Sequence, residues 1–236
     1  MGAQSAVITL EVLPCATNQD YDDVIDQSDF PEVKPPGLIV QCVGASHESL
    51  TSVSFWSGGA DALSEIGGSS RGVIEAVREL KSIPAEVDRK LVPLEQTFIN
   101  PELLEWATDD AVDEKGLVGF VFTGPPSRSF DYYGVLRAVG LPTEWPTGML
   151  IHASGSSSTN WHVLDVFRSL EEAEPYLSEV KTLIKTQADS RGAEVVFDDE
   201  VNVFRLHALV ANPDAVELER WARETPESTW RSVNSW

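Results

Sequence analysis

The clearest candidate for acid–base chemistry in this sequence is His152, which lies in the apolar segment 148–155. A second apolar segment, 161–167, follows after a loop rich in Gly, Ser and Asn, so the two segments predict a β-hairpin. If their less apolar faces pair, His152 lies diagonal to Asp165, with Cβ atoms about 7–8 Å apart. A carboxylate at that distance can orient an imidazole as a general base.

Two alternatives to this pairing stay open at the level of sequence. The loop does not fix the register, and a slip of one residue places His162 beside His152 instead. His162 stands at a strand start, where we expect it to be exposed. A His–Asp pair can also be purely structural, with each side chain satisfying the other in a seam between strands.

Other side chains extend the candidate site. His207 and Arg205 share one face of a predicted strand within 194–210, which makes His207 a second catalytic candidate and Arg205 a substrate-binding one. Large aromatic side chains suit the walls of a pocket for a flat apolar ligand. The aromatic residues assigned to substrate binding are Tyr132, Trp161, Phe167 and Trp56.

The spacing of possible metal ligands predicts no metal site. The four histidines are scattered, and the only cysteines, Cys15 and Cys42, lack metal-ligand spacing, so we expect both to be buried free thiols. The sequence contains no Gly-x-Gly-x-x-Gly, Walker A, Gly-x-Ser-x-Gly or His-Glu-x-x-His motif. We therefore expect no cofactor.

Charge narrows the range of partners. The chain has 38 acidic and 17 basic residues and a formal net charge of −21, which repels phosphate backbones and anionic lipids. It has no apolar run long enough to span a bilayer and no basic N-terminal flank typical of a signal peptide. We expect a cytoplasmic protein whose partner is a small apolar or aromatic molecule, with no nucleic acid and no membrane.

The chain repeats itself with a period of 111 residues. Segments 37–44 and 50–56 have the pattern of 148–155 and 161–167, and the offset holds from the first predicted strand past the hairpin. Asn100-Pro101 and Asn212-Pro213 each open a predicted C-terminal helix. A tandem duplication follows, with one repeat over 1–111 and a second over 112–236.

Each repeat predicts the element order β-α-β-β-α-β, which is the ferredoxin-like order of an α+β protein. In the first repeat the strands are expected over 7–13, 37–44, 50–56 and 91–99, and the helices over 17–26 and 73–81. A four-stranded sheet covered by helices on one face must bury its other face. We expect the two sheets to pack face to face as an intramolecular α+β barrel, either as a monomer with an internal pseudo-dimer or as a homodimer.

The hairpins, with Pro-x-Gly before an apolar strand and Trp56 or Phe167 at the end of the next strand, resemble the dimeric α+β barrel superfamily. They are most similar to proteins like the antibiotic biosynthesis monooxygenases. Several oxygenases of that group use a Trp at the position of Trp56. The haem-degrading branch uses an Asn on the first strand, which this chain lacks. Many single-domain relatives carry His at the positions of His152 and His207, where the first repeat has Gln41 and Gln96.

The resemblance implies a small-molecule enzyme, and we expect a cofactor-independent monooxygenase that acts on an aromatic or polyketide-like compound. Such an oxygenase needs a base, here His152, in an apolar and water-poor cavity. One alternative is a polyketide cyclase or isomerase that uses the same His as base. Another is a non-catalytic ligand-binding or stress-associated barrel protein.

Overall fold

The computed structural model describes residues 6–27, 37–46, 48–57, 73–100, 102–106, 116–124, 131–141, 143–156, 160–192 and 202–211. Each half of the chain has the order β-α-β-β-α-β, as the hydrophobic patterns predict. The strands are β1 (Ala6–Pro14), β2 (Leu38–Ala45), β3 (Ser49–Ser57), β4 (Asp88–Ile99), β5 (Val118–Gly124), β6 (Met149–Ser156), β7 (Trp161–Phe167) and β8 (Asn202–Ala211). The helices are α1 (Asn18–Ile25), α3 (Val73–Leu80), α4 (Leu103–Trp106), α5 (Tyr132–Ala138) and α6 (Leu170–Ser190).

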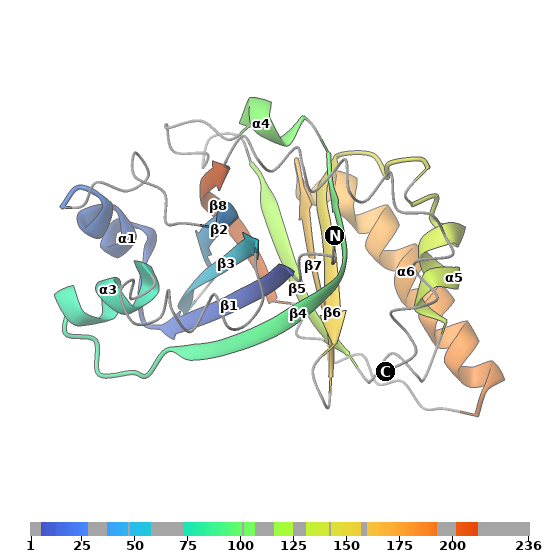
Figure 1. Ribbon diagram of the computed structural model, residues 1–236, viewed down its shortest axis with the longest axis horizontal. Helices are drawn as coiled ribbons and strands as arrows, with labels where there is room; N and C mark the ends of the chain where they lie inside the picture. Colours follow the sequence, from blue (N-terminus) through green and yellow to red (C-terminus); the bar gives the residue numbers. More distant parts are fainter. Residues whose placement is uncertain are drawn as a thin grey trace.

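The eight strands form one closed antiparallel barrel in the order β1-β3-β2-β8-β5-β7-β6-β4 (Figure 1). Two long strands join the halves. The first part of β4 pairs with β1 and its second part with β6, while β8 pairs with β5 and then with β2. An α+β barrel of ferredoxin-like type is therefore confirmed, and β4 and β8 make it one continuous sheet.

Three hydrophobic clusters form the core. One fills the barrel and includes Phe55, Leu150 and Phe204. The other two lie outside the sheet, one beneath α1 and α3 and one beneath α5 and α6. Figure 1 shows the two helical layers at opposite ends of the molecule. Each half of the sheet thus has one face toward the barrel interior and one toward its own helices.

The helices over the sheet begin at polar caps. Thr17 accepts a hydrogen bond from the backbone N–H of Asp20, in a capping box that starts α1. Ser169 caps the 21-residue helix α6, and Asp131 caps α5. None of the described helices is long and apolar enough to cross a membrane.

Strict alternation along 149–154 would put Leu150 on the same face as His152, but the bulge between Met149 and Ile151 turns Leu150 into the barrel and Met149 toward the helices. The expected burial of the two thiols is only partly correct. Cys42 is a buried thiol, as expected, but Cys15 is exposed because it lies in a left-handed turn just after β1. The first part of the strand predicted within 194–210 and the helix predicted after 212 lie outside the described residues.

Candidate functional site

The β6–β7 pairing places His152 directly opposite Asp165, not diagonal to it. A bulge between Met149, which pairs with Phe167, and Ile151, which pairs with Val166, shifts the register by one residue and so sets His152 opposite Asp165. Both side chains face α5 and α6, and His152 Nδ1 lies 2.6 Å from Asp165 Oδ1. The two residues are 1% and 5% exposed, so this hydrogen bond forms in a low-dielectric environment that strengthens it.

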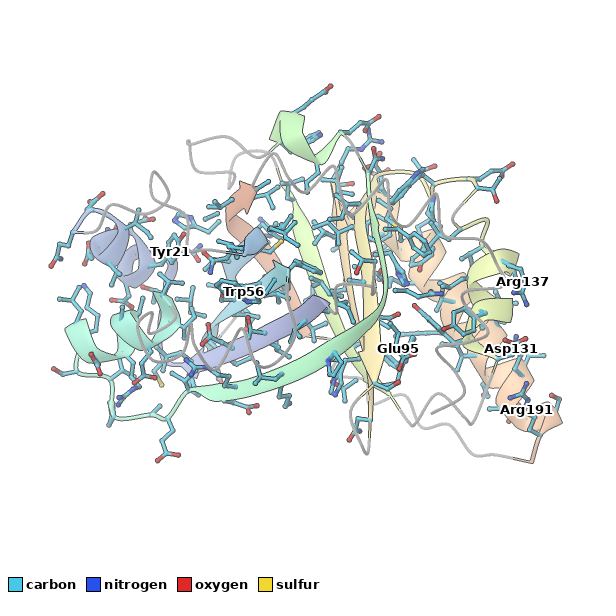
Figure 2. The ribbon with its side chains drawn as sticks, viewed as in Figure 1. Tyr21, Trp56, Glu95, Asp131, Arg137 and Arg191 are labelled. Atoms are coloured by element: carbon cyan, nitrogen blue, oxygen red, sulfur yellow. The ribbon has the colours of Figure 1, made fainter. Side chains whose placement is uncertain are left out.

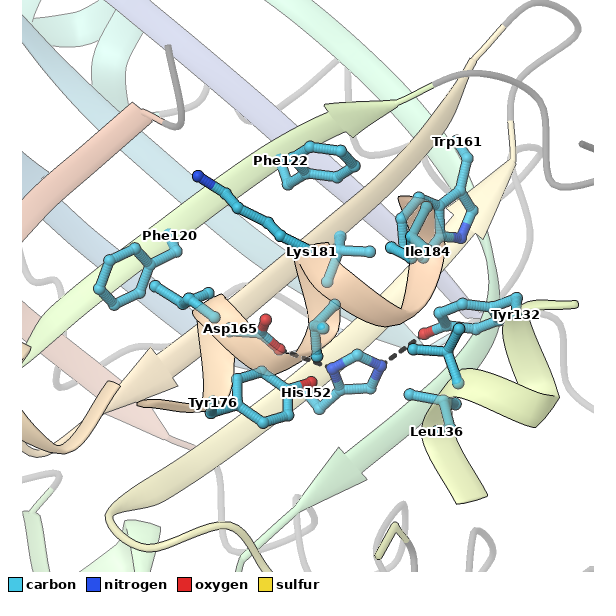
Figure 3. A pocket seen from close by; sticks show the side chains of 14 residues that line it. Phe120, Phe122, Tyr132, Leu136, His152, Trp161, Asp165, Tyr176, Lys181 and Ile184 are labelled. Atoms are coloured by element: carbon cyan, nitrogen blue, oxygen red, sulfur yellow. Dashed lines mark hydrogen bonds and ion pairs between the residues drawn. The ribbon is translucent and has the colours of Figure 1, made fainter. Parts of the chain in front are cut away.

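Tyr132, the first residue of α5, completes a chain of three side chains. Its phenol oxygen lies 2.5 Å from His152 Nε2 (Figure 3). Burial, with the nearby charge of Asp165 as a smaller cause, holds the pKa of Tyr132 well above its usual range. The phenol is therefore protonated and donates to Nε2. His152 then carries its proton on Nδ1 and donates it to Asp165.

This order of hydrogen bonds changes the role expected for His152, which was that of the general base. Its Nε2 is occupied by the phenol, so a substrate reaches the imidazole only through the Tyr132 oxygen. The order of hydrogen bonds is that of a nucleophile–His–Asp triad, with a phenol in the place of the nucleophile. Such a chain can take a proton at the Tyr132 oxygen while it passes another to His152.

The chain of three borders a cavity of about 40 Å³ between the sheet and helices α5 and α6. Apart from the polar groups of the chain of three and the hydroxyl of Tyr176, the walls are mostly aromatic and aliphatic. The lining residues are Phe120, Phe122, Tyr132, Val135, Leu136, His152, Trp161, Val163, Asp165, Tyr176, Leu177, Val180, Lys181 and Ile184.

The aromatic wall fixes the phenol. The rings of Tyr132 and Trp161 meet edge to face with centroids 4.6 Å apart, and Trp161 meets Phe122 at 5.7 Å. The Phe98 ring stacks on the imidazole of His152, with centroids 5.9 Å apart. These contacts keep the three hydrogen-bonding groups in line without help from a ligand.

Two of the predicted aromatic residues, Tyr132 and Trp161, line this cavity. Phe167 is fully buried nearby, where it packs against Phe120 and Tyr176 and supports the wall from behind. The predicted grouping of His152, Asp165, Tyr132 and Trp161 is thus present in space.

Three other predicted residues lie elsewhere. His207 bonds through Nε2 to Asp22 of α1 at 2.6 Å and contacts the Tyr21 ring, at the other end of the molecule. Arg205 is exposed on β8. Trp56 donates from Nε1 to Thr9 Oγ1 at 2.7 Å, on the side of α1 and α3 (Figure 2). The structure does not bring these three residues to the His152 cavity.

His162 is buried, which corrects the expectation of an exposed side chain. It lies opposite Gly155, and its Nδ1 is 3.1 Å from Thr123 Oγ1. Burial and, to a smaller extent, the positive charge of Lys90 lower its pKa. It points to the opposite side of β7 from its neighbours Trp161 and Val163, which line the cavity.

Helix α6 contributes cavity residues that the search for chemical motifs missed. Their signal is helical periodicity: one face of α6 repeats at intervals of three and four residues. The cavity-lining residues on this face are Tyr176, Leu177, Val180, Lys181 and Ile184.

The corresponding place in the first half is chemically different. At an offset of 111 residues, Gln41 stands for His152 and Ser54 for Asp165. The Gln41 amide donates to the Ser54 hydroxyl at 3.1 Å, so this pair has no basic group. Among the described residues, no cluster of three or more His, Cys, Asp or Glu side chains could hold a metal ion.

By sequence the chain matches no protein-family model and no curated protein. By structure it is similar to a protein of Lactobacillus acidophilus NCFM provisionally named a monooxygenase, with a TM-score of 0.55 and 15% identity over 88% of this chain and 97% of that one. A protein of Fusobacterium nucleatum subsp. nucleatum with the same provisional name gives a TM-score of 0.52 and 10% identity over 89% and 96%. At these identities the likeness shows the fold.

Proposed function

We propose that this protein is an enzyme that removes a proton from a small aromatic molecule and lets the resulting anion react with dioxygen, as a cofactor-independent monooxygenase. The observation that carries the proposal is the chain Tyr132–His152–Asp165 at the wall of an aromatic cavity. A buried base next to an apolar binding space is what this chemistry requires. The fold shared with provisionally named monooxygenases agrees with it.

The proposed reaction begins at the Tyr132 oxygen. It takes a proton from a substrate CH₂ group that is attached to an aromatic ring and is activated by a carbonyl, either bonded directly to it or conjugated with it through the ring, while the phenol proton passes to His152 Nε2. Asp165 stabilises the imidazolium that forms. The electron pair left on the substrate carbon passes to O₂, a C–O bond forms, and the proton returns to the peroxide. Loss of water from this hydroperoxide leaves a ketone, so that CH₂ and O₂ become C=O and H₂O with no added reductant.

The test is oxygen consumption with anthrone and with the smaller 2-indanone as probes. We expect the wild type to consume one O₂ for each ketone formed. Among the three hydrogen-bonded side chains, Tyr132 is the only one that can touch the substrate, and Tyr132→Phe removes its hydroxyl. This variant should lower turnover about 100-fold or more, which is the usual contribution of general-base catalysis. Tyr133→Phe is the matched control, because this neighbouring phenol is not among the residues that line the cavity. Equal loss in both variants, or none in either, argues against the relay.

A cyclase or isomerase is the second candidate, because the chain of three performs proton transfer and does not itself require oxygen. In that case the wild type exchanges the acidic protons of 2-indanone for deuterium without consuming O₂. Tyr132→Phe again slows the exchange. Measurement of both signals on one sample separates the two reactions.

A non-catalytic barrel is the third candidate, and one observation favours it: Tyr132, His152 and Asp165 already satisfy one another, beside a cavity of only about 40 Å³. Pockets for drug-sized ligands usually span a few hundred Å³. If this candidate holds, His152→Gln changes the free energy of unfolding, while neither oxygen consumption nor deuterium exchange exceeds the rate without protein.

A further inference from the structure

One cation borders the cavity, the ammonium of Lys181. Six of the ten basic residues within the described ranges form an ion pair with a carboxylate. Lys181 forms none within that part of the chain, although the protein has 38 acidic residues. It is also the only Lys or Arg among the described residues that line the cavity.

The position of Lys181 on α6 makes its charge unusual. It lies on the cavity-facing stripe of the helix, one turn after Leu177 and three residues before Ile184, where an apolar residue would continue the pattern. Neither neighbour one turn away is acidic, since the residues at i−4 and i+4 are Leu177 and Lys185. The usual stabilisation of a helix lysine by an i±4 carboxylate is therefore missing, and Lys185 adds a small repulsion.

Figure 3 shows the Lys181 side chain extending from α6 across the cavity opening toward Phe120 and Phe122, while Tyr132 enters from the other side. The stem is half-buried against these aromatic walls. The other charged group in the cavity, Asp165, is engaged by His152. A ligand that lies between the aromatic walls therefore meets a phenol at one end and, at the other, an ammonium that forms no ion pair with the carboxylates of the described residues.

We infer that the cavity takes an aromatic carboxylate, whose ring lies against the aromatic walls and whose carboxylate pairs with Lys181. This inference rests on the proposed function and makes its substrate class narrower: an aromatic acid in place of a neutral aromatic compound. A local cation is what such a ligand needs here, because the net charge of −21 repels anions at long range. Lys181 is a specificity-determining residue in this scheme, separate from the proton relay.

Benzoate and benzamide test the inference, because they have nearly the same shape and differ in charge. Affinity is measured for each by calorimetric titration at low and at high salt. We expect the wild type to bind benzoate about tenfold more tightly than benzamide, as a half-buried ion pair of about 1.4 kcal/mol gives, and to lose most of this preference at high salt. Lys181→Gln should bind the two compounds equally, with its affinity for benzamide unchanged.

Lys185→Gln is the matched control, since it removes the same charge from the same helix at an exposed position one turn away. It should keep the preference for benzoate. Leu177→Trp fills the cavity from α6 and should weaken both probes, which locates them in this cavity. Equal affinity of the wild type for both compounds, failure of both to bind, or an unchanged preference in Lys181→Gln would overturn the inference.

Binding and turnover separate this inference from the function on which it rests. Tyr132→Phe keeps Lys181 and should retain the preference for benzoate. If the wild type prefers benzoate through Lys181 but neither consumes oxygen nor exchanges protons with the probes above, the proposed reaction fails and the ligand class stands. If turnover depends on Tyr132 while Lys181→Gln changes nothing, the ligand class fails and the reaction stands.

Discussion

At the scale of single residues, the site depends on which polar group touches which. Asp165 fixes the Nδ1 proton of His152, and the raised pKa of Tyr132 fixes the direction of the second hydrogen bond. In the proposed reaction the phenol oxygen, and not the imidazole, is therefore the atom that takes the substrate proton.

His162 predicts a pH dependence of stability. Burial and Lys90 lower its pKa below its ordinary value of about 6.5, so the unfolded chain takes up a proton before the folded protein does. The neutral, buried imidazole therefore makes its full contribution to the free energy of unfolding above about pH 6.5. This contribution is lost as the pH falls below that value and through the lowered pKa of His162. His162→Gln keeps an amide for the Thr123 hydroxyl and has no such titration.

Urea unfolding of wild type and His162→Gln between pH 7.5 and 5 checks this expectation. The stability difference, wild type minus variant, should become smaller or more negative as the pH falls through this range. The carboxylates titrate in both proteins and cancel in the difference. A difference independent of pH would contradict the assigned burial of the imidazole.

At the scale of elements, the cavity is a product of helix placement. The sheet supplies His152 and Asp165, but α5 supplies Tyr132 and α6 supplies most of the outer wall. Helix α6 packs on the sheet through residues at helical spacing, including Ala173, Tyr176 and Ile184. Its start is held by Ser169, whose hydroxyl accepts from the backbone N–H of Glu172 at 3.2 Å.

Ser169→Ala removes this cap and should lower the free energy of unfolding by about 1 kcal/mol. Thr186→Ala is the control on the same helix, because its hydroxyl bonds only to the Thr182 carbonyl on the exposed face. Alanine has the higher helix propensity there, so this variant should be neutral or slightly more stable. Equal destabilisation of both would mean that the cap contributes nothing of its own.

At the scale of the whole molecule, the halves are joined through two seams, β2–β8 and β4–β6. Each seam contains a glycine, Gly44 in β2 and Gly155 in β6, and the two lie 111 residues apart in the sequence. A Cβ on Gly44 would stand 1.9 Å from the Arg205 carbonyl oxygen, and one on Gly155 would stand 2.0 Å from the Pro93 carbonyl oxygen. The contacted atoms belong to the backbone of the neighbouring strand, so neither can move without opening the seam.

Gly44→Ala and Gly155→Ala should each destabilise the protein by about 2 kcal/mol or more, in the range of strained backbone and overpacked sites. Ser156→Ala, next to Gly155 at the end of β6, removes a buried hydroxyl that has no hydrogen-bond partner among the described residues, so this variant should be as stable as the wild type or slightly more stable. Thermal unfolding followed by circular dichroism measures all three. A Gly155→Ala protein as stable as the wild type would show that the two strands do not approach this closely.

The sequence by itself determined the element order, because hydrophobic periodicity, prolines and helix caps act over a few residues. It also favoured a shared face for His152 and Asp165, but it left open the alternative register that brings His162 beside His152. Their direct pairing required the bulge at Met149, which depends on contacts with the next strand. The placement of His207 against Asp22 required the barrel to close, because these residues are far apart in the chain.

Only the tertiary structure decided that the proton chain ends at Tyr132 and that Lys181 borders its cavity. Both residues are on helices, and the angle at which a helix lies on a sheet follows from the packing of many side chains at once. Local sequence patterns mark the inner face of α6 but do not say which strand residues that face meets. Local sequence patterns therefore predict most of the strand pairing, while the cavity depends on how the helices pack on the sheet.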